Sequence, residues 1–262
     1  MAAPETAEAP FVPGPEVERH CRELLAAYVP KLVGPDRVEP HIAELLDLTG
    51  GFVDRFNYFA PRMPDDAKAR LLISGCACGS EMIVARRYGF QEVHGTEVVP
   101  ELVSICNQRL EGAEGFSASL YDGAQLPYPD HHFTSVVSGH IIEHTPSPRA
   151  YLHEHLRVLR PGGWFFLEFP NRFHRRELHT GVPSVEYLPG PLRAGVLRWL
   201  SSPLGPCSTA VRQHYEAIRN TLQPISIGKV RRWLRSAKGH PARLVHSYAP
   251  APGYVRMLLY RT

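Results

Sequence analysis

Between residues 70 and 171, short apolar runs alternate with segments whose apolar residues recur at helical spacing. Strands that alternate with helices form parallel sheets with crossover helices, so this rhythm predicts an α/β protein with a doubly wound, mostly parallel sheet. The expected strands are "RLLISG", "EVHGTEV", "GFSASLYD", "FTSVVSGH" and "GWFFLEFPN", and the expected helices are "SEMIVARRYG", "PELVSICNQRL" and "SPRAYLHEHLRVL".

The flanking sequence extends this core on both sides. Residues 15–60 have helical spacing, and the proline-rich stretch 172–224 holds helical pieces that are typical of a lid. Two short runs near the end, "RLVHSYA" and "GYVRMLLYR", can pair as an antiparallel C-terminal edge and bring the sheet to seven strands. We therefore expect a disordered tail (1–14), an N-terminal helical cap (15–65), the core (66–171), a helical lid or substrate cap (172–224) and a C-terminal completion of the sheet (225–262).

Composition limits the class of protein. The 262 residues are 44% hydrophobic and 21% charged, which is ordinary for a globular protein. A net charge of +3 is too small to indicate a nucleic-acid partner, and no apolar run reaches the length of a membrane span. Five cysteines without a regular spacing, and a first segment without the apolar stretch of a signal peptide, predict a reduced, cytoplasmic protein.

The turn after the first expected strand reads "GCACGS". Small residues at this place let a nucleotide-like ligand lie against backbone N–H groups at a helix N-terminus. A dinucleotide fingerprint would read G-x-G-x-x-G, but here Gly75 and Gly79 flank Ala77 and the third glycine is missing. Glu97 ends the next strand, where a carboxylate can accept both ribose hydroxyls of an adenosine. This loop alone leaves two classes of adenosine cofactor open.

Three further phrases accompany the loop in a fixed order: "DGAQLPYPD", "IIEH" and "RVLRPGG". With "GCACG", they make residues 70–171 resemble the class I S-adenosylmethionine-dependent methyltransferases of the methyltransferase domain 11 type, which have a Rossmann-like fold. A dehydrogenase would show neither the L-P-x-x-D phrase nor the P-G-G turn. The resemblance implies S-adenosylmethionine as the cofactor.

The resemblance also implies roles for single residues. The loop should line the methionine end of the cofactor, Glu97 should bind the ribose, and the phrase after the third strand should hold the adenine. Ala77 stands where the family has glycine, and its methyl group fits if its φ is negative. The expected cofactor-binding residues are Gly75, Cys76, Ala77, Gly79, Glu97, Asp122, Gly123, Ala124 and, beside the sulfonium, Ser138.

A hydroxyl acceptor must lose its proton, and histidine is the usual base near neutral pH. Among the 14 histidines, four fall on loops that should face the transferred methyl: His140, His144, His174 and His179. The candidate bases are His140, His144 and His179. Glu143 and His144 could contribute to a metal site, but no spacing of metal ligands supports one, so no metal is expected.

The phrase "PNRFHRRELHTGVPSVEYLP" resembles a segment of methyltransferases from polysaccharide and glycoside pathways. We therefore expect a biosynthetic O-methyltransferase that acts on a small molecule or on a sugar or glycan hydroxyl. An N- or C-methyltransferase of a natural product stays open, as does a non-catalytic methyltransferase-like binding module. The expected partners are the acceptor and a possible second copy of the chain, with no nucleic acid.

Overall fold

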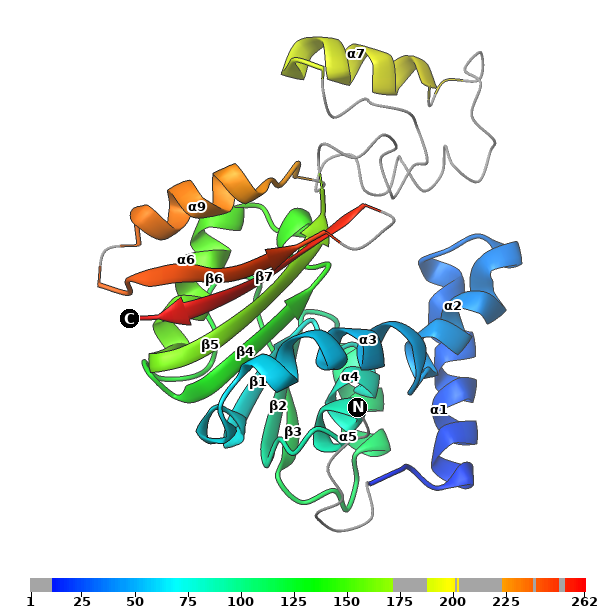
Figure 1. Ribbon diagram of the computed structural model, residues 1–262. Helices are drawn as coiled ribbons and strands as arrows, with labels where there is room; N and C mark the ends of the chain where they lie inside the picture. Colours follow the sequence, from blue (N-terminus) through cyan, green and yellow to red (C-terminus); the bar gives the residue numbers. More distant parts are fainter. Residues whose placement is uncertain (1–10, 172–187, 201, 203–222, 238, 250–252) are drawn as a thin grey trace.

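The computed structural model describes residues 11–171, 188–200, 202, 223–237, 239–249 and 253–262. Seven strands form one sheet in the order β3-β2-β1-β4-β5-β7-β6 (Figure 1). The strands are β1 (Arg70–Ser74), β2 (Glu92–Glu97), β3 (Phe116–Leu120), β4 (Phe133–Gly139), β5 (Leu159–Pro170), β6 (Ala242–Tyr248) and β7 (Tyr254–Arg261).

The predicted doubly wound sheet is confirmed. Strands β1 to β5 pair in parallel, whereas β7 pairs antiparallel with both β5 and β6. The last two strands therefore form the expected antiparallel pair at the C-terminal edge. Within that pair β7 lies inside and β6 forms the rim of the sheet.

Helices cover both faces of the sheet. One face carries α3 (Gly50–Phe59), α4 (Ser80–Arg86) and α5 (Pro100–Arg109), and the other carries α6 (Pro148–Val158) and α9 (Ile227–Arg235). Helices α1 (Pro15–Tyr28) and α2 (Val38–Leu46) pack beside α5. The remaining elements are α7 (Gly190–Leu200) and the short 3₁₀ turns η1 (Val29–Lys31), η2 (Pro35–Arg37), η3 (Ala60–Arg62), η4 (Asp65–Lys68) and η5 (Ile142–His144).

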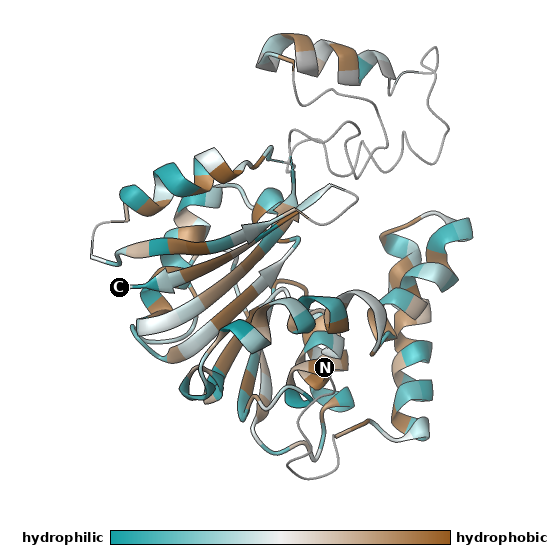
Figure 2. Cartoon of the chain, in the orientation of Figure 1, coloured by the Kyte–Doolittle hydropathy of each residue, from teal (hydrophilic) through white to brown (hydrophobic). Residues whose placement is uncertain are grey.

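Side-chain alternation along β5 shows how the sheet separates two apolar layers. Phe165, Leu167 and Phe169 pack with α6 and α9, whereas Phe166 packs with α3 and α4. Because side chains alternate across a strand, Glu168 shares the α3 face with Phe166. Figure 2 shows the hydrophobic strands between helices whose outward sides are hydrophilic.

Local sequence signals set several element ends. Pro100 begins α5, the hydroxyl of Ser226 caps α9 by accepting from the N–H of Lys229, and Gly89 follows α4 with a φ of +84°. The "RPGG" phrase was expected to form a turn before the strand. Instead, β5 begins at Leu159 and contains the phrase, and its pairing with β4 shifts register there.

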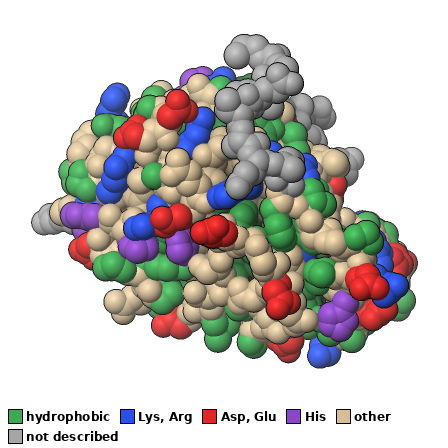
Figure 3. Space-filling view, turned by 90° about the horizontal axis from the view of Figure 1, so that it is seen from below, with side chains coloured by type: hydrophobic (Ala, Val, Ile, Leu, Met, Phe, Trp, Pro, Cys, Tyr) green, Lys and Arg blue, Asp and Glu red, His purple; other side chains and the backbone are tan. Residues whose placement is uncertain are grey.

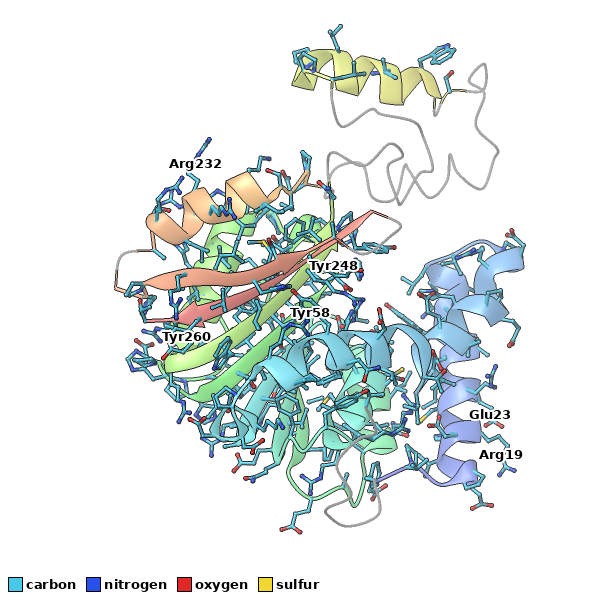
Figure 4. All side chains as sticks on the ribbon, viewed as in Figure 1. Arg19, Glu23, Tyr58, Arg232, Tyr248 and Tyr260 are labelled. Atoms are coloured by element: carbon cyan, nitrogen blue, oxygen red, sulfur yellow. The ribbon has the colours of Figure 1, made fainter. Side chains whose placement is uncertain are left out.

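Helix α3 crosses the sheet towards the C-terminal strands. The hydroxyl of Tyr58 on α3 lies 2.6 Å from Nδ1 of His246, and its ring stacks with Tyr248 at 6.0 Å between centroids. Figure 4 shows Tyr58 and Tyr248 close together at this junction. Through these contacts, α3 packs against β6 at the C-terminal edge of the sheet.

Surface charge on the lower face is mixed. Seen from below, acidic and basic side chains alternate with small apolar groups, and this face shows no broad basic area (Figure 3). Within the part of the chain that the structure describes, no helix combines the length and the apolar character that crossing a bilayer requires.

A chain of four buried side chains links β1, β4 and α6. Nδ1 of His155 lies 2.7 Å from the carbonyl of Tyr151, so Nδ1 carries the proton and Nε2 accepts from Ser74 at 2.9 Å. The hydroxyl of Tyr151 donates to Ser74 at 2.8 Å, which leaves Ser138 to donate to Tyr151 at 2.7 Å. Every proton in this chain has one acceptor, so the neutral imidazole completes the network.

Burial lowers the pKa of His155 to about 4. An unfolded histidine titrates near 6.5, so between these values the unfolded chain binds more protons than the folded one. We predict that the free energy of unfolding decreases as the pH falls below about 6.5, by up to about 1.4 kcal/mol per pH unit from this residue alone. Urea titrations near neutral pH and near pH 5 measure the decrease.

The variant His155→Gln removes the titrating group, and the exposed His20→Gln on α1 is the control. The difference in the free energy of unfolding between neutral pH and pH 5 should be about 2 kcal/mol smaller in His155→Gln than in the wild type. In His20→Gln this difference should be unchanged. A pH dependence of His155→Gln that runs parallel to the wild type would contradict this assignment.

Candidate active site

The bend between β1 and α4 has an unusual backbone. Gly75 has a φ of +75°, Ala77 of +45° and Gly79 of +87°. The N–H groups of Gly75 and Cys76 both donate to the carbonyl of Thr96 on β2, which holds the bend against the neighbouring strand. The condition under which the methyl group of Ala77 would fit, a negative φ, is therefore not met, because the bend holds this residue in a left-handed conformation. For alanine this conformation costs about 1–2 kcal/mol.

The bend contains two cysteines. Cys76 and Cys78 are both buried. A hydrogen bond with Cys106 and burial raise the pKa of the Cys76 thiol well above its usual value, and burial raises the pKa of Cys78 to about 12. These thiols are packing groups, and only the backbone of Cys76 is available to a cofactor. The four cysteines in the described residues are free and buried, and Cys207 lies outside them.

Glu97 ends β2 with its carboxylate turned to the bend. Oε2 accepts from the N–H of Ala77 at 3.1 Å, and Oε1 accepts from Val98 and Val99 at 2.7 and 3.3 Å. A carboxylate offers about four acceptor positions, so one remains on Oε2. Tyr28 at the end of α1 packs against the same apolar cluster as Ala77 and Val99.

The phrase after β3 forms a tight turn. Oδ1 of Asp122 accepts from the N–H groups of Ala124 and Gln125 at 2.8 and 2.9 Å, and these bonds lower the pKa of Asp122. Gly123 has a φ of +83°, as this turn requires. Asp122 and Ala124 are exposed, so they are free to contact a ligand at this edge.

These groups fit an adenosine-bearing cofactor. Val98 and Leu120 are large apolar side chains that stay 54% exposed at the ends of neighbouring strands β2 and β3. An apolar surface next to the Glu97 carboxylate suits a purine and a ribose hydroxyl. The sequence did not single out Tyr28, Val98 or Leu120, because ordinary apolar and aromatic residues carry no motif.

Ser138 lies at the same edge but is fully buried, and its hydroxyl donates to Tyr151. Its side chain therefore belongs to the network below the site. In this arrangement, a contact between Ser138 and the cofactor would have to use the backbone.

His140 follows β4 with a φ of +59°, which is uncommon for a residue other than glycine. Two contacts with Glu168 hold it. The N–H of His140 donates to the carbonyl of Glu168 at 2.9 Å, and Nε2 lies 2.9 Å from its carboxylate Oε1. Tyr254 packs edge-on against the ring at 4.5 Å between centroids. His140 is thus fixed in one orientation.

Sheet register places the groups around Glu168. Gly139 on β4 and Arg256 on β7 are its direct neighbours across the two strand pairs. Nε of Arg256 donates to Oε2 at 2.5 Å, and Nε of Arg55 on α3 donates to Oε1 at 2.6 Å. A Cβ atom on Gly139 would lie 2.6 Å from the guanidinium carbon of Arg55, so glycine makes room for this arginine.

The network extends beyond Glu168 and shifts the pKa values of Glu168 and His140 towards their charged forms. Arg55 also donates to Glu81 on α4 at 3.1 Å, and Arg256 donates to Asp54 at 2.7 Å. Burial alone would raise the pKa of Glu168, but the hydrogen bond with His140 and the charge of Arg55 lower it well below its usual range. Burial opposes the charge of His140, yet the neighbouring carboxylates of Glu143 and Glu168 outweigh it and raise its pKa.

Glu143 in η5 is the exception among the buried carboxylates. It is 1% exposed, and neither carboxylate oxygen has a hydrogen-bond partner in the structure. Two imidazoles lie near Oε1, with Nδ1 of His140 at 3.7 Å and Nε2 of His144 at 3.9 Å. No group of three or more potential metal ligands occurs among the described residues.

The structure brings together two of the three candidate bases. His140 and His144 both flank Glu143, with 29% and 34% of their side chains exposed. His179 lies outside the described residues. Arg55, Glu168 and Arg256 were missed by the sequence analysis, although one clue existed: an acidic residue inside the apolar run "GWFFLEFP" needs a buried partner.

We predict that Glu97→Gln weakens cofactor binding at least tenfold. An amide has one acceptor oxygen and an NH₂ group that faces the N–H donors of the bend, and hydrogen bonds to charged groups contribute about 1.5–3 kcal/mol. Calorimetry with S-adenosylmethionine measures the affinity, and the exposed Glu101→Gln on α5 should stay within twofold of the wild type. A Glu97→Gln affinity within threefold of the wild type would refute the role of this carboxylate.

Residues 72–167 match the model of a methyltransferase domain family. The chain is 28% identical over 204 residues to ajmaline N-methyltransferase from Rauvolfia serpentina, covering 75% of this chain and 65% of that protein. It is 34% identical over 124 residues to a ubiquinone biosynthesis O-methyltransferase from Xanthomonas oryzae pv. oryzae, covering 45% of this chain and 49% of that protein. The matches thus span less than two thirds of these relatives.

Solved structures share the fold. An S-adenosylmethionine-dependent methyltransferase from Mesorhizobium loti superposes with a TM-score of 0.58 at 15% identity, over 82% of this chain and all of that one. One from Aquifex aeolicus gives 0.54 at 14% identity, over 89% and 97% of the two chains. These likenesses show the same fold that the matched domain implies. Residues 72–167 therefore form a domain of the methyltransferase family, in a chain with the fold of the class I S-adenosylmethionine-dependent methyltransferases, which are enzymes whose cofactor is S-adenosylmethionine.

Proposed function

We propose that this protein transfers a methyl group to a nucleophilic oxygen or nitrogen of a small-molecule acceptor that lies beside His140. The observation that carries the proposal is the position of His140. It stands at the carboxyl edge of the sheet, on the strand next to the β1 bend, and is held there in a strained conformation by Glu168. Strained residues cluster at functional sites.

A hydroxyl acceptor is the first candidate, with His140 as the base. Bound S-adenosylmethionine supplies the activated methyl group. Nε2 of His140 is engaged by Glu168, so Nδ1 is the nitrogen that would receive the proton of the hydroxyl. A carboxylate that orients one ring nitrogen and stabilises the imidazolium is the usual support of a histidine base.

An amine acceptor is the second candidate. The relatives from Rauvolfia serpentina are named as N-methyltransferases, whereas those from Xanthomonas oryzae are named as O-methyltransferases. The carboxylate of Glu143 beside His140 favours a site that tolerates positive charge. Paired acceptors that differ only in the heteroatom, such as benzyl alcohol and benzylamine, distinguish the two candidates.

Other expectations stay predictions. A sugar or glycan acceptor rests on the segment around His179, outside the described residues. The domain boundaries, a homodimer, a biosynthetic role and a cytoplasmic location rest on the sequence alone. A non-catalytic binding module would bind S-adenosylmethionine but release no S-adenosylhomocysteine with any acceptor.

We predict that turnover rises with pH as His140 loses its proton. Because the pKa of His140 is raised above its ordinary value near 6.5, the acidic limb of kcat/KM should have its midpoint above that value. The measurement is release of S-adenosylhomocysteine across the pH range with a panel of phenols, sugars and amines. A limb centred below the ordinary histidine value would exclude His140 as the base.

His140→Asn tests the base directly, because asparagine tolerates a positive φ. Turnover should fall about 10²-fold or more while the calorimetric affinity for S-adenosylmethionine changes less than threefold. His20→Asn is the exposed control and should change neither. If His140→Asn, His144→Asn and His179→Asn all keep the full rate, no histidine of this set is the base.

A further inference from the structure

The two arginines on Glu168 hold different oxygens of its carboxylate. Arg256 donates to Oε2, and its second partner, Asp54, is mostly exposed to solvent. Arg55 donates from Nε to Oε1 at 2.6 Å, and Nε2 of His140 lies 2.9 Å from that same oxygen. The guanidinium of Arg55 and the imidazole of His140 therefore share one acceptor atom.

The side chain of Arg55 on α3 is fixed by its surroundings. It is 11% exposed, its guanidinium carbon lies 5.4 Å from the ring centroid of Phe52, and it donates to Glu81 on α4 at 3.1 Å. Gly139 leaves the space that the guanidinium fills. Because an arginine keeps its proton in proteins, this arrangement fixes a permanent positive charge beside the carboxylate of Glu168.

The ionisable groups around His140 and its carboxylate partners act on its proton in opposite directions. Besides Arg55, Glu81 and Arg256, they are Glu44 on α2, Glu143 and His144 in η5, Glu168 on β5 and Tyr254 on β7. Burial lowers the pKa of His140, the carboxylates of Glu143 and Glu168 raise it, and the charge of Arg55 lowers it.

A base must give up its own proton before it can accept one from a substrate. An imidazolium beside the carboxylates of Glu143 and Glu168 would retain its proton, because an opposite charge within about 4–6 Å favours the charged form. A guanidinium on the shared oxygen has the reverse effect, since it takes part of the negative charge and repels the imidazolium. Neutral His140 still donates its Nε2 proton to Glu168, so its orientation is kept.

We infer that Arg55 is a positioning residue for the base. By holding the oxygen of Glu168 that His140 also contacts, it lets this carboxylate orient the imidazole without retaining the imidazole's proton at neutral pH. The inference rests on the proposed function, in which His140 accepts a proton from the acceptor. It assigns to Arg55 the control of the pH range in which His140 is competent, and Arg55 acts through Glu168 alone.

The test follows the ring resonances of His140 across the pH range in the full chain without any ligand, and His140→Asn identifies these resonances. Arg55→Gln removes the fixed charge, so the pKa of His140 should rise by about 1 or more. Arg55→Lys keeps a positive charge and should show less than half of that rise. The control Arg62→Gln removes an arginine that donates to the carbonyl of Tyr58, on the turn after α3, and should leave the pKa unchanged.

A second variant controls for loss of the fold. Arg55→Gln leaves two buried carboxylates short of a donor, which lowers stability. Combining it with Glu81→Gln removes one buried carboxylate together with the guanidinium and keeps the charges balanced. Glu168 then acts on His140 without a guanidinium on their shared oxygen, so the pKa should rise again. An unchanged or lowered pKa in both variants, or an equal rise in Arg55→Lys and Arg55→Gln, overturns the inference.

Turnover gives a readout that support of the fold alone would not produce. In Arg55→Gln the acidic limb of kcat/KM should move to higher pH together with the pKa of His140. The rate should therefore fall near pH 7 and return to within about threefold of the wild type near pH 9. A rate that stays equally low at every pH would show that Arg55 only stabilises the fold, and would overturn the inference.

Failure of the proposed function looks different. A pKa of His140 that rises in Arg55→Gln without a matching movement of the acidic limb would contradict His140 as the base, while the effect of Arg55 on the imidazole would stand. A wild type that releases no S-adenosylhomocysteine with any acceptor would contradict the proposed function itself, and the ligand-free titration would still test Arg55.

Discussion

The geometry of the site depends on one buried carboxylate. Glu168 accepts from Arg55, Arg256 and His140, which come from α3, β7 and the end of β4. A buried carboxylate is stable only with such partners, so the same charge that requires the two arginines also fixes the histidine. The left-handed backbone of His140 persists because its N–H and its ring both hold Glu168. The partners that stabilise the buried carboxylate of Glu168 therefore also orient the imidazole of His140.

The strands and helices could be predicted because their signals are local. Apolar periodicity, Pro100 at a helix start and Ser226 at another lie within a few residues of the structure that they specify. The Glu168 network could not be predicted in this way. Arg55 and Arg256 lie 113 and 88 residues from Glu168, and only the folded sheet brings them together. Local patterns carry no information on such pairs.

The residues of the candidate site that belong to a sequence motif could be predicted. Glu97 and Asp122 lie at the carboxyl edge, as parallel strands require. The φ of Ala77 could not be predicted in this way, since the conformation follows from hydrogen bonds between the bend and Thr96 on the next strand. The sequence pattern also placed Ser138 at the right strand end without showing that its hydroxyl points into the Tyr151 network. Strand ends are predictable, and side-chain directions at those ends are not.

Arg109 on α5 ties the first two helices to the loop region of the site. It is 1% exposed, donates to Glu18 on α1 at 2.7 Å and to the carbonyl of Leu46 at the end of α2 at 3.1 Å, and also donates to the carbonyl of Cys78 and the hydroxyl of Ser80. Swinging α1 and α2 away would leave this guanidinium in an apolar cluster without its carboxylate, at a cost of about 3–5 kcal/mol. These helices therefore serve as a fixed wall, and small molecules must enter and leave by another side.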